Sequence, residues 1–320
     1  MMPIPSIPKD FLSVLHFSPE ALIHCLRLSA LVKRDRSLRR TAPSAGALAG
    51  RHVALLFDKP SLRTMATFEV AIHEIGGHVI IPAPNAVFGG RESPADVARN
   101  LERWVVAAVI RTFGQERVEK VAAAAPRLHV INALTDEEHP CQALADYLTL
   151  QEHLGVLPGR TLAFIGDGNN VATSLAHAGV MLGVHVHIAS PEGFDLPATV
   201  VSQCEAVSRH GAKVTLFRDP REAVATADAV YTDVWASMGQ EGEATSRANV
   251  FRPYQVNATL MAAARPGALF MHCLPAHRGD EVTDEVIDSK SSVVFDEAEN
   301  RLHTQKALLL MLLAPEAASC

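Results

Sequence analysis

The segment Val53-Ala54-Leu55-Leu56-Phe57-Asp58-Lys59-Pro60-Ser61-Leu62-Arg63-Thr64 joins an apolar β-type run to a helical pattern that continues to about Ile75. This pattern predicts a strand, a short loop and a helix, which together form the repeating unit of α/β folds. The loop delivers Ser61, Arg63 and Thr64 to the start of the helix. Backbone N–H groups without helical partners and the helix dipole both favour an anion at that position. Taken alone, such a loop is more often a capped helix with a solvated arginine.

The same alternation of short apolar runs and helical periods continues along the chain. Strands are predicted near residues 53–57, 78–81, 107–111, 129–132, 161–165, 185–189, 213–217, 229–232 and 268–272. Helices are predicted at residues 61–75, 94–104, 115–124 and 140–153. The region from Asp284 to Leu313 is predicted to hold a short strand, Ser292–Phe295, between helices. Strand–helix alternation of this kind predicts parallel sheets covered by helices on both faces.

The chain length and a Gly- and Pro-containing break in the pattern together predict two domains. A chain of 320 residues has room for two domains or one large one. The segment Leu154-Gly155-Val156-Leu157-Pro158-Gly159 is the strongest break in the pattern, so the boundary is placed after residue 154. We therefore expect an α/β protein of two domains, each a parallel β-sheet flanked by helices, with the active site in the cleft between them.

Composition limits the classes of partner. A net charge near −6 and a pI near 6.2 argue against nucleic-acid binding, which goes with a basic surface. No apolar run reaches the roughly 18 residues of a membrane span, and the amino terminus lacks a signal-peptide pattern. The odd number of scattered cysteines is typical of free thiols in a reducing cytosol: Cys25, Cys141, Cys204, Cys273 and Cys320. The sequence thus predicts a cytoplasmic protein with neither nucleic acid nor membrane as partner.

Polar residues recur where predicted strands end. Arg63, Arg111, Asn170, Asp233 and Cys273 each lie at or just after such an end. Ligands of open parallel sheets bind beyond the carboxyl ends of the strands. Five polar strand ends therefore predict one binding cleft, although each residue alone is compatible with an ordinary solvated or buried position.

His139-Pro140-Cys141-Gln142 predicts a helix start with two polar side chains beside it. Proline suits the first turn of a helix, so His139 is placed at the cap and Gln142 in the first turn. Imidazole and carboxamide groups are suitable donors to a carbonyl oxygen that gains negative charge in a transition state. A single histidine at a helix start is nevertheless more often a plain polar cap.

Two further loops follow predicted strands. Gly166-Asp167-Gly168 resembles part of a dinucleotide fingerprint, but Asn169-Asn170-Val171 replaces the third glycine, and no acid follows the next strand at the expected place. An NAD cofactor is therefore not predicted. Asp233 at a strand end is suited to an ammonium partner, and Ser237 with Gly239 is suited to a closing loop. The histidines of His73-Glu74 and His78 are five residues apart rather than four, so no metal site is predicted.

Together these segments resemble the aspartate/ornithine carbamoyltransferase family, in its ornithine branch. The family's order and spacing are matched by Ser-x-Arg-Thr (61–64), His-Pro-Cys-Gln (139–142), Asp-x-x-x-Ser-Met-Gly (233–239), His-Cys-Leu-Pro-Ala (272–276) and the closing motif at 295–303. The Ser-Met-Gly motif is absent from aspartate carbamoyltransferases, so it carries the substrate preference. The resemblance extends from about Lys9 to Leu313.

The resemblance implies two substrates, a homotrimer and no cofactor. Residues 1–154 would bind carbamoyl phosphate, with a helix at about 303–317 packed back on them, and residues 155–302 would bind L-ornithine. The implied carbamoyl phosphate ligands are Ser61, Leu62, Arg63, Thr64, Arg111, His139, Pro140, Cys141, Gln142, Cys273, Leu274 and Arg301. The implied ornithine ligands are Asn170, Asp233, Ser237 and Met238. The implied catalytic residues are Arg63, Arg111, His139, Asp233 and Cys273.

The implied reaction is carbamoyl transfer in arginine metabolism. A neutral δ-amine attacks the carbamoyl carbon, a tetrahedral oxyanion forms, and phosphate leaves with a proton to give L-citrulline. The δ-ammonium of free ornithine has a lysine-like pKa near ~10, so it must lose a proton first. Asp233, Cys273 and the leaving phosphate are all candidates for accepting that proton. The sequence leaves both this choice and the biosynthetic or catabolic direction open.

Two departures from the family bear on phosphate binding. Met65 stands where relatives carry arginine, and Val87 stands where they often carry glutamine. A lost cation costs about 1.5–3 kcal/mol if it made a charged hydrogen bond and nothing if it faced away. These departures are the only support for a non-catalytic relative. Putrescine and N-acetylornithine are the rival amines, but neither would use both Asp233 and the carboxylate donors expected near Asn170.

Overall fold

The computed structural model describes residues 5–83, 90, 92–236, 242 and 244–318, and the chain forms two compact units. Unit 1 comprises residues 1–148 and 299–320, and unit 2 comprises residues 149–298. The division falls within helix α5 (Pro140–Leu154) and within helix α12 (Val294–Leu313). The boundary expected after residue 154 lies at the end of α5, and the shared cleft stays a prediction.

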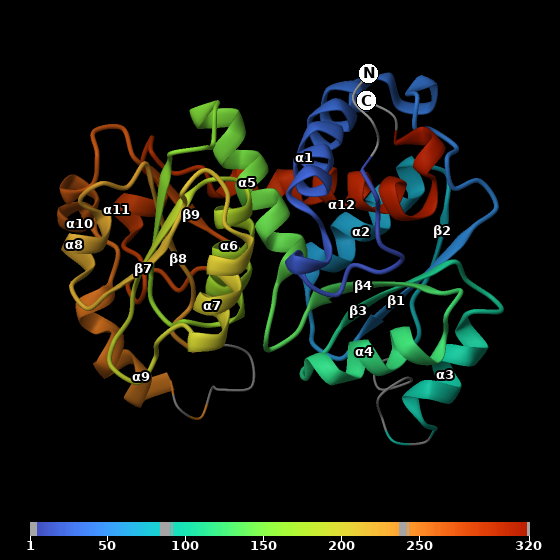
Figure 1. Ribbon diagram of the computed structural model, residues 1–320, viewed down its shortest axis with the longest axis horizontal. Helices are drawn as coiled ribbons and strands as arrows, with labels where there is room; N and C mark the ends of the chain where they lie inside the picture. Colours follow the sequence, from blue (N-terminus) through green and yellow to red (C-terminus); the bar gives the residue numbers. More distant parts are fainter. Residues whose placement is uncertain (1–4, 84–89, 91, 237–241, 243, 319–320) are drawn as a thin grey trace. The chain divides into compact units, whose positions relative to one another are not determined.

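Unit 1 is built on a parallel sheet with strand order β2-β1-β3-β4 (Figure 1). Its strands are β1 (His52–Phe57), β2 (His78–Ile80), β3 (Ala107–Arg111) and β4 (His129–Leu134). Strands such as β3, all of whose residues are buried, are typical of sheets covered on both faces. The predicted parallel sheet is confirmed.

Helices cover both faces of this sheet. One face carries α3 (Pro94–Leu101) and α4 (Gln115–Ala124), and the other carries α1 (Pro19–Arg34) and α2 (Leu62–Glu74) (Figure 1). Alternate strand residues, including Ala54, Leu56, Ala108 and Ile110, form one core with the helix residues Leu101 and Val118. Serine side chains cap α1, α2 and α3, which fixes where each helix begins.

Unit 2 contains a second parallel sheet, with strand order β7-β6-β5-β8-β9. Its strands are β5 (Thr161–Ile165), β6 (His185–Ala189), β7 (Val214–Phe217), β8 (Ala229–Thr232) and β9 (Leu269–His272). One face carries α6 (Asn170–Met181) and α7 (Ala198–Val207), and the other carries α8 (Pro220–Val224), α10 (Ala258–Ala263) and α11 (Asp284–Ile287) (Figure 1). Helix α9 (Ala244–Phe251) lies at one end of the unit.

The strand orders place a topological switch point in each sheet. In unit 1 the chain moves outward from β1 to β2 and then returns to the other side of β1 at β3. In unit 2 it moves from β5 to β6 and β7 and then returns beside β5 at β8. Ligands of such sheets bind outside the carboxyl ends of the strands at these points. The segments that follow β1, β3, β5 and β8 are therefore the candidate positions for a site.

The predicted strand Ser292–Phe295 is wrong. Ser292 forms only an isolated parallel bridge with Phe270, and helix α12 begins two residues later at Val294. Asp296 and Glu297 lie in the first turn of α12, where negative charge stabilises a helix start and outweighs the β-propensity of two valines and a phenylalanine.

No helix in the described part of the chain is both long and apolar enough to cross a membrane. The four described cysteines, Cys25, Cys141, Cys204 and Cys273, are free thiols, as predicted; Cys320 lies outside the described residues.

Candidate active site

The loop after β1 presents a helix start at the switch point of unit 1. Ser61, with extended backbone, caps α2 by accepting a hydrogen bond from the Thr64 N–H at 3.3 Å. Leu62 is 82% exposed, which leaves the backbone of this turn accessible. The Arg63 side chain is half-buried and makes no hydrogen bond or ion pair within the described part of the chain. A cation with an open partner position beside free helix N–H groups is suited to phosphate.

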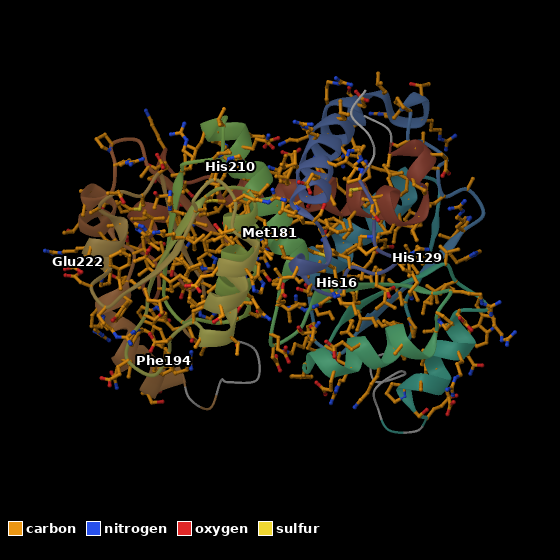
Figure 2. All side chains as sticks on the ribbon, viewed as in Figure 1. His16, His129, Met181, Phe194, His210 and Glu222 are labelled. Atoms are coloured by element: carbon orange, nitrogen blue, oxygen red, sulfur yellow. The ribbon has the colours of Figure 1, made fainter. Side chains whose placement is uncertain are left out.

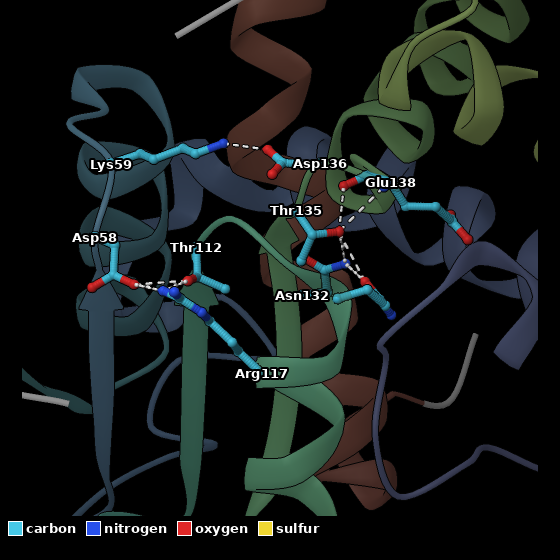
Figure 3. Close-up of polar contacts among 9 residues, drawn as sticks. Asp58, Lys59, Thr112, Arg117, Asn132, Thr135, Asp136 and Glu138 are labelled. Atoms are coloured by element: carbon cyan, nitrogen blue, oxygen red, sulfur yellow. Dashed lines mark hydrogen bonds and ion pairs between the residues drawn. The ribbon is translucent and has the colours of Figure 1, made fainter. Parts of the chain in front are cut away.

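The same loop is braced against the ends of the neighbouring strands (Figure 3). Phe57 is in register with Arg111 at the end of β3, and the Asp58 N–H donates to the Arg111 carbonyl at 2.9 Å. The Asp58 carboxylate accepts from the Thr112 hydroxyl at 2.7 Å. The Lys59 ammonium pairs with Asp136 at 2.5 Å and lies 4.2 Å from the centre of the Phe113 ring. These contacts fix the loop relative to Arg111.

A second brace, also drawn in Figure 3, holds the segment that leads from β4 into α5. The Gln115 carboxamide oxygen accepts from Asn132 at 3.1 Å and from the Thr135 hydroxyl at 2.8 Å. The Thr135 hydroxyl in turn accepts from the Glu138 N–H at 3.2 Å. Because Glu138 precedes His139, this brace sets where His139 enters α5. The sequence alone gave no signal for either brace.

Arg301 joins three motifs that are far apart in the sequence. Its guanidinium donates to the Thr64 hydroxyl at 3.0 Å, across 237 residues, and to the Gln142 carboxamide oxygen, across 159 residues. The Gln142 side-chain amide in turn donates a hydrogen bond to Asp146 at 2.7 Å. Thr64, Gln142 and Arg301 are each at most 2% exposed. The predicted helix start at Pro140 is confirmed, and the Ser-x-Arg-Thr, His-Pro-Cys-Gln and closing motifs meet in unit 1.

His139 lies in this group as a neutral imidazole. Burial, followed by the positive charges of Arg301 and Arg111, holds the pKa of His139 well below its ordinary value. A neutral ring can donate one N–H to a carbonyl oxygen without adding a third positive charge. Arg111 is itself only 6% exposed at the end of β3. The group therefore combines two fixed cations with one neutral donor.

Cys141 has a different role from its neighbours. Its side chain is fully buried, and its thiol donates to the Asn132 carbonyl at 3.3 Å. Burial raises the pKa of this thiol to about 12, so it stays protonated and unreactive. Any contribution of Pro140 and Cys141 to ligand binding would come from the backbone at the start of α5.

In unit 2, Asp233 follows β8 at the switch point. Its carboxylate accepts from the Asn169 side chain at 2.9 Å and from the Cys273 thiol at 3.1 Å, and the side chain is nearly buried. Asn169 also caps α6, which begins at Asn170. A carboxylate offers about four acceptor positions, so two remain for an ammonium group. Asn169, Asp233 and Cys273 thus meet beyond neighbouring strand ends, and Asn170 begins the adjacent helix; the role of Asn170 and Asp233 in binding ornithine stays a prediction.

A buried chain of hydrogen bonds holds the turn that carries Cys273. His272 donates from Nε2 to Glu281 at 3.2 Å, which leaves Nδ1 to accept from the Leu274 N–H at 2.9 Å. Both His272 and Glu281 are fully buried. Leu274 has φ of +56°, a conformation that side chains disfavour, and the hydrogen bond from its N–H stabilises it. No sequence pattern indicates the role of Glu281.

Arg247 is another residue that the sequence analysis missed. It donates to Asp167 and to the Trp235 carbonyl, and its guanidinium carbon lies 4.8 Å and 5.2 Å from the ring centres of Phe194 and Phe251. Figure 2 labels Phe194 in unit 2. These contacts join the loop after β8, which carries Asp233, to the turn after β5. Arg247 therefore orders the segment that follows Asp233.

The glycine turn after β5 is explained by packing within the chain. A Cβ atom at Gly168 would lie 2.3 Å from the Leu196 backbone nitrogen. The Gly168 N–H also donates to the Phe194 carbonyl at 2.8 Å. This glycine is therefore required by the chain's own loop, which accounts for the partial dinucleotide fingerprint without a cofactor.

One group of described residues has the spacing of a metal site. The ligand atoms of Asp233, His272 and Cys273 lie within 4.8 Å of one another. Both nitrogens of His272 already have protein partners, so a metal would have to displace Glu281 or the Leu274 N–H.

Ser237, Met238 and Val87 lie outside the described residues, while Met65 is half-buried in the first turn of α2.

Comparison with known families accounts for both units. The family described as aspartate/ornithine carbamoyltransferase, carbamoyl-P binding domain, matches residues 9–152. Its partner, the Asp/Orn binding domain of the same family, matches residues 158–312. The chain belongs to the aspartate/ornithine carbamoyltransferase family. The predicted family and enzyme class are confirmed.

Individual relatives of this carbamoyltransferase family are similar over nearly their whole length. The ornithine carbamoyltransferase of Anoxybacillus flavithermus is 47% identical over 308 residues, covering 95% of this chain and 96% of that protein. The one from a Parafrankia species is 51% identical over 283 residues, covering 88% and 87%. Among solved structures, ornithine carbamoyltransferase from Pyrococcus furiosus has a TM-score of 0.90 and 45% identity, covering 95% of this chain and 96% of its own. The fold class of two parallel α/β domains is thereby confirmed.

Proposed function

We propose that this chain is an ornithine carbamoyltransferase, which transfers the carbamoyl group of carbamoyl phosphate to the δ-amine of L-ornithine and releases L-citrulline and phosphate. The observation that carries the proposal is the meeting of Thr64, Gln142 and Arg301 beside the neutral His139. Three motifs of one family converge there on the chemistry that its reaction needs.

Carbamoyl phosphate is assigned to the loops of unit 1, within residues 1–154. Ser61, Leu62, Arg63 and Thr64 would hold the phosphate at the start of α2, where the Arg63 fork matches two phosphate oxygens. Arg111, His139 and Gln142 would face the carbamoyl end. Their charges and donors are fixed before the substrate arrives, so they can stabilise the developing oxyanion without reorganisation.

Ornithine is assigned to residues 155–302, at the switch point of unit 2. Asp233 would accept the α-ammonium group with the two acceptor positions that Asn169 and Cys273 leave open. Asn170, together with Ser237 and Met238, would bind the α-carboxylate. Putrescine lacks that carboxylate and N-acetylornithine lacks that ammonium, so ornithine is the amine that would use all of these groups.

The chemistry requires a neutral amine, an electrophilic carbon and a leaving phosphate. Fixing amine and carbonyl together supplies roughly 7–11 kcal/mol of the barrier. Cys273, whose thiol donates to Asp233, and Leu274, whose N–H donates to His272, would complete the binding of the carbamoyl group. The proton from the amine passes to Asp233, to Cys273 or to the leaving phosphate.

The assembly and setting rest on the family resemblance alone. We propose a homotrimer that acts in the cytoplasm in arginine metabolism. Light scattering on the purified protein tests the first point, because a monomeric enzyme with full activity would refute it.

The function is tested with purified protein, carbamoyl phosphate and ornithine. We expect citrulline and phosphate in equal amounts. Arg63→Ala should abolish transfer while the unfolding midpoint is kept, because the phosphate loses its bidentate partner. Arg103→Ala removes an exposed arginine next to the end of α3 and serves as the matched control. Wild-type turnover by Arg63→Ala would refute the phosphate assignment.

A further inference from the structure

A second charged cavity lies in unit 1, at a different place from the proposed substrate site. Its volume is about 670 Å³, and none of the residues assigned above to either substrate lines it. It is formed by the 3₁₀ segment Asp35–Thr41, the carboxyl end of α2 and one turn of α12. A volume of this size is typical of small-molecule sites.

The charges that line this cavity are mostly positive. Arg36, Arg39, Arg40 and Lys306 line it, and among the described lining residues Glu74 is the one acid. The whole chain, by contrast, carries a net charge near −6. Four cations against one acid therefore mark a local positive field on an acidic protein, and concave surfaces of one sign concentrate counter-ions.

The single acid, Glu74, already forms ion pairs with two of the four cations. Glu74 accepts from the Arg36 side chain at 3.0 Å and also pairs with Lys306. Burial raises the pKa of Glu74, but the hydrogen bonds and charges of Lys306 and Arg36 outweigh it and hold that pKa below its ordinary value. Glu74 is thus an ionised bridge that holds these two cations, one of which, Lys306, has a nearly buried side chain.

The other two cations lack any such bridge. The side chains of Arg39 and Arg40 make no hydrogen bond or ion pair within the described part of the chain, although both residues line the cavity. The nearby Asp35 is paired with Arg34 at 2.8 Å. Arg39 also has φ of +51°, which interrupts the 3₁₀ segment at this residue.

The cavity also depends on a close backbone contact. Gly46 and Gly76 both line it, and a Cβ atom at Gly76 would lie 2.8 Å from the Gly46 Cα. Glycine at position 76 therefore lets the end of α2 approach the turn before β1, whereas a Cβ atom at Gly46 would meet no atom within 4 Å. The arrangement is therefore a property of the fold and not only of flexible surface side chains.

We propose that this cavity binds a small multivalent phosphate compound at a site separate from the substrate site. Each guanidinium offers a planar fork of donors that matches two phosphate oxygens, which suits Arg39 and Arg40 acting together. Arg36, from the same 3₁₀ segment, and Lys306, from α12, add charge and share Glu74 as their acidic partner. One phosphate would satisfy one fork, so a compound with two linked phosphates fits the site better than a single inorganic phosphate.

Titration calorimetry with inorganic pyrophosphate tests this site. Wild type is expected to show a saturable binding class that Arg63→Ala retains and that Arg39→Gln/Arg40→Gln weakens at least ~tenfold, with the single variants in between. Arg103→Gln should bind as wild type does. The double variant should keep the wild-type unfolding midpoint and its transfer rate without pyrophosphate, because neither arginine belongs to the substrate site.

Three results would overturn the proposal. The first is that all pyrophosphate binding disappears in Arg63→Ala, which would place it in the phosphate loop. The second is undiminished binding by the double variant. The third is citrate binding as tightly as pyrophosphate, which would show that the cavity selects charge and not phosphate.

Discussion

Arg301 contacts two buried side chains from motifs that lie 237 and 159 residues away. Its position makes the start of α2 and the start of α5 parts of one group. A lysine at this position would keep the charge but lose the fork that reaches Thr64 and Gln142 together.

We predict that Arg301→Met lowers kcat/KM for carbamoyl phosphate about 100-fold, because each hydrogen bond from a charged group contributes about 1.5–3 kcal/mol. Arg301→Lys should recover only part of the loss. Steady-state kinetics of both variants provide the measurement. A kcat/KM for Arg301→Lys equal to that of wild type would show that charge alone matters at this position.

His139 predicts how stability depends on pH. The unfolded chain protonates this side chain near ~6.5, whereas burial and two arginines keep the folded form neutral to lower pH. The unfolded state therefore binds more protons below that value, and the free energy of unfolding falls as the pH falls. Above ~6.5 the contribution of His139 is complete.

We predict that His139→Gln flattens this pH dependence by about 1 kcal/mol between about pH 6.5 and pH 5.5. Urea unfolding of wild type and variant at matched pH values measures the difference. His303, whose pKa burial lowers to about 4, titrates in both proteins and so cancels in the comparison. Parallel pH profiles for the two proteins would contradict a neutral, buried His139.

At the scale of single elements, the turn after β9 depends on residues outside the substrate site. Glu281 accepts from the His272 ring and from the His277 N–H, and His272 in turn holds the Leu274 N–H. These contacts join the segment before α11 to the turn that carries Cys273. The hydrophobic pattern predicts Cys273 at a strand end. No periodic pattern indicates that Glu281 supports this turn.

We predict that Glu281→Leu destabilises the protein by about 3 kcal/mol, because the buried His272 ring and the His277 N–H both lose their acceptor. Glu281→Gln keeps one acceptor oxygen and should lose less than half as much. Urea unfolding measures stability, and the rate of Cys273 alkylation reports whether the turn has moved. An unchanged alkylation rate in a destabilised Glu281→Leu would mean that Glu281 supports the fold without positioning Cys273.

Element prediction from the sequence succeeded where periodicity is strong and failed where two signals compete. The buried apolar runs of β3, β5, β6 and β8 gave those strands with their observed bounds. The run Ser292–Phe295 was misassigned because its β-branched residues directly precede the acidic first turn of α12. Phe295 is 70% exposed at the start of that helix, so its hydrophobicity was no guide to a buried strand.

At the scale of the whole molecule, the proposed site residues were predicted from one rule of parallel sheets. Arg63, Arg111, Asn170 and Asp233 lie at or after the ends of β1, β3, β5 and β8, which are the four strands at the two switch points. Strand ends can be predicted from the hydrophobic pattern, so these four positions could be predicted from the sequence. The contacts that hold them were not, because pairs such as Lys59–Asp136 and Asp167–Arg247 join residues with no sequence relation.

The most direct test of the account is the choice of amine. Carbamoyl phosphate is supplied with ornithine, N-acetylornithine, putrescine or aspartate, and the ureido product is measured for each. Because Asp233 is proposed to bind the α-ammonium group and Asn170 the α-carboxylate, we predict that kcat/KM for ornithine exceeds that for every other amine. No product with any amine would contradict the enzyme assignment, and product with putrescine alone would contradict the substrate.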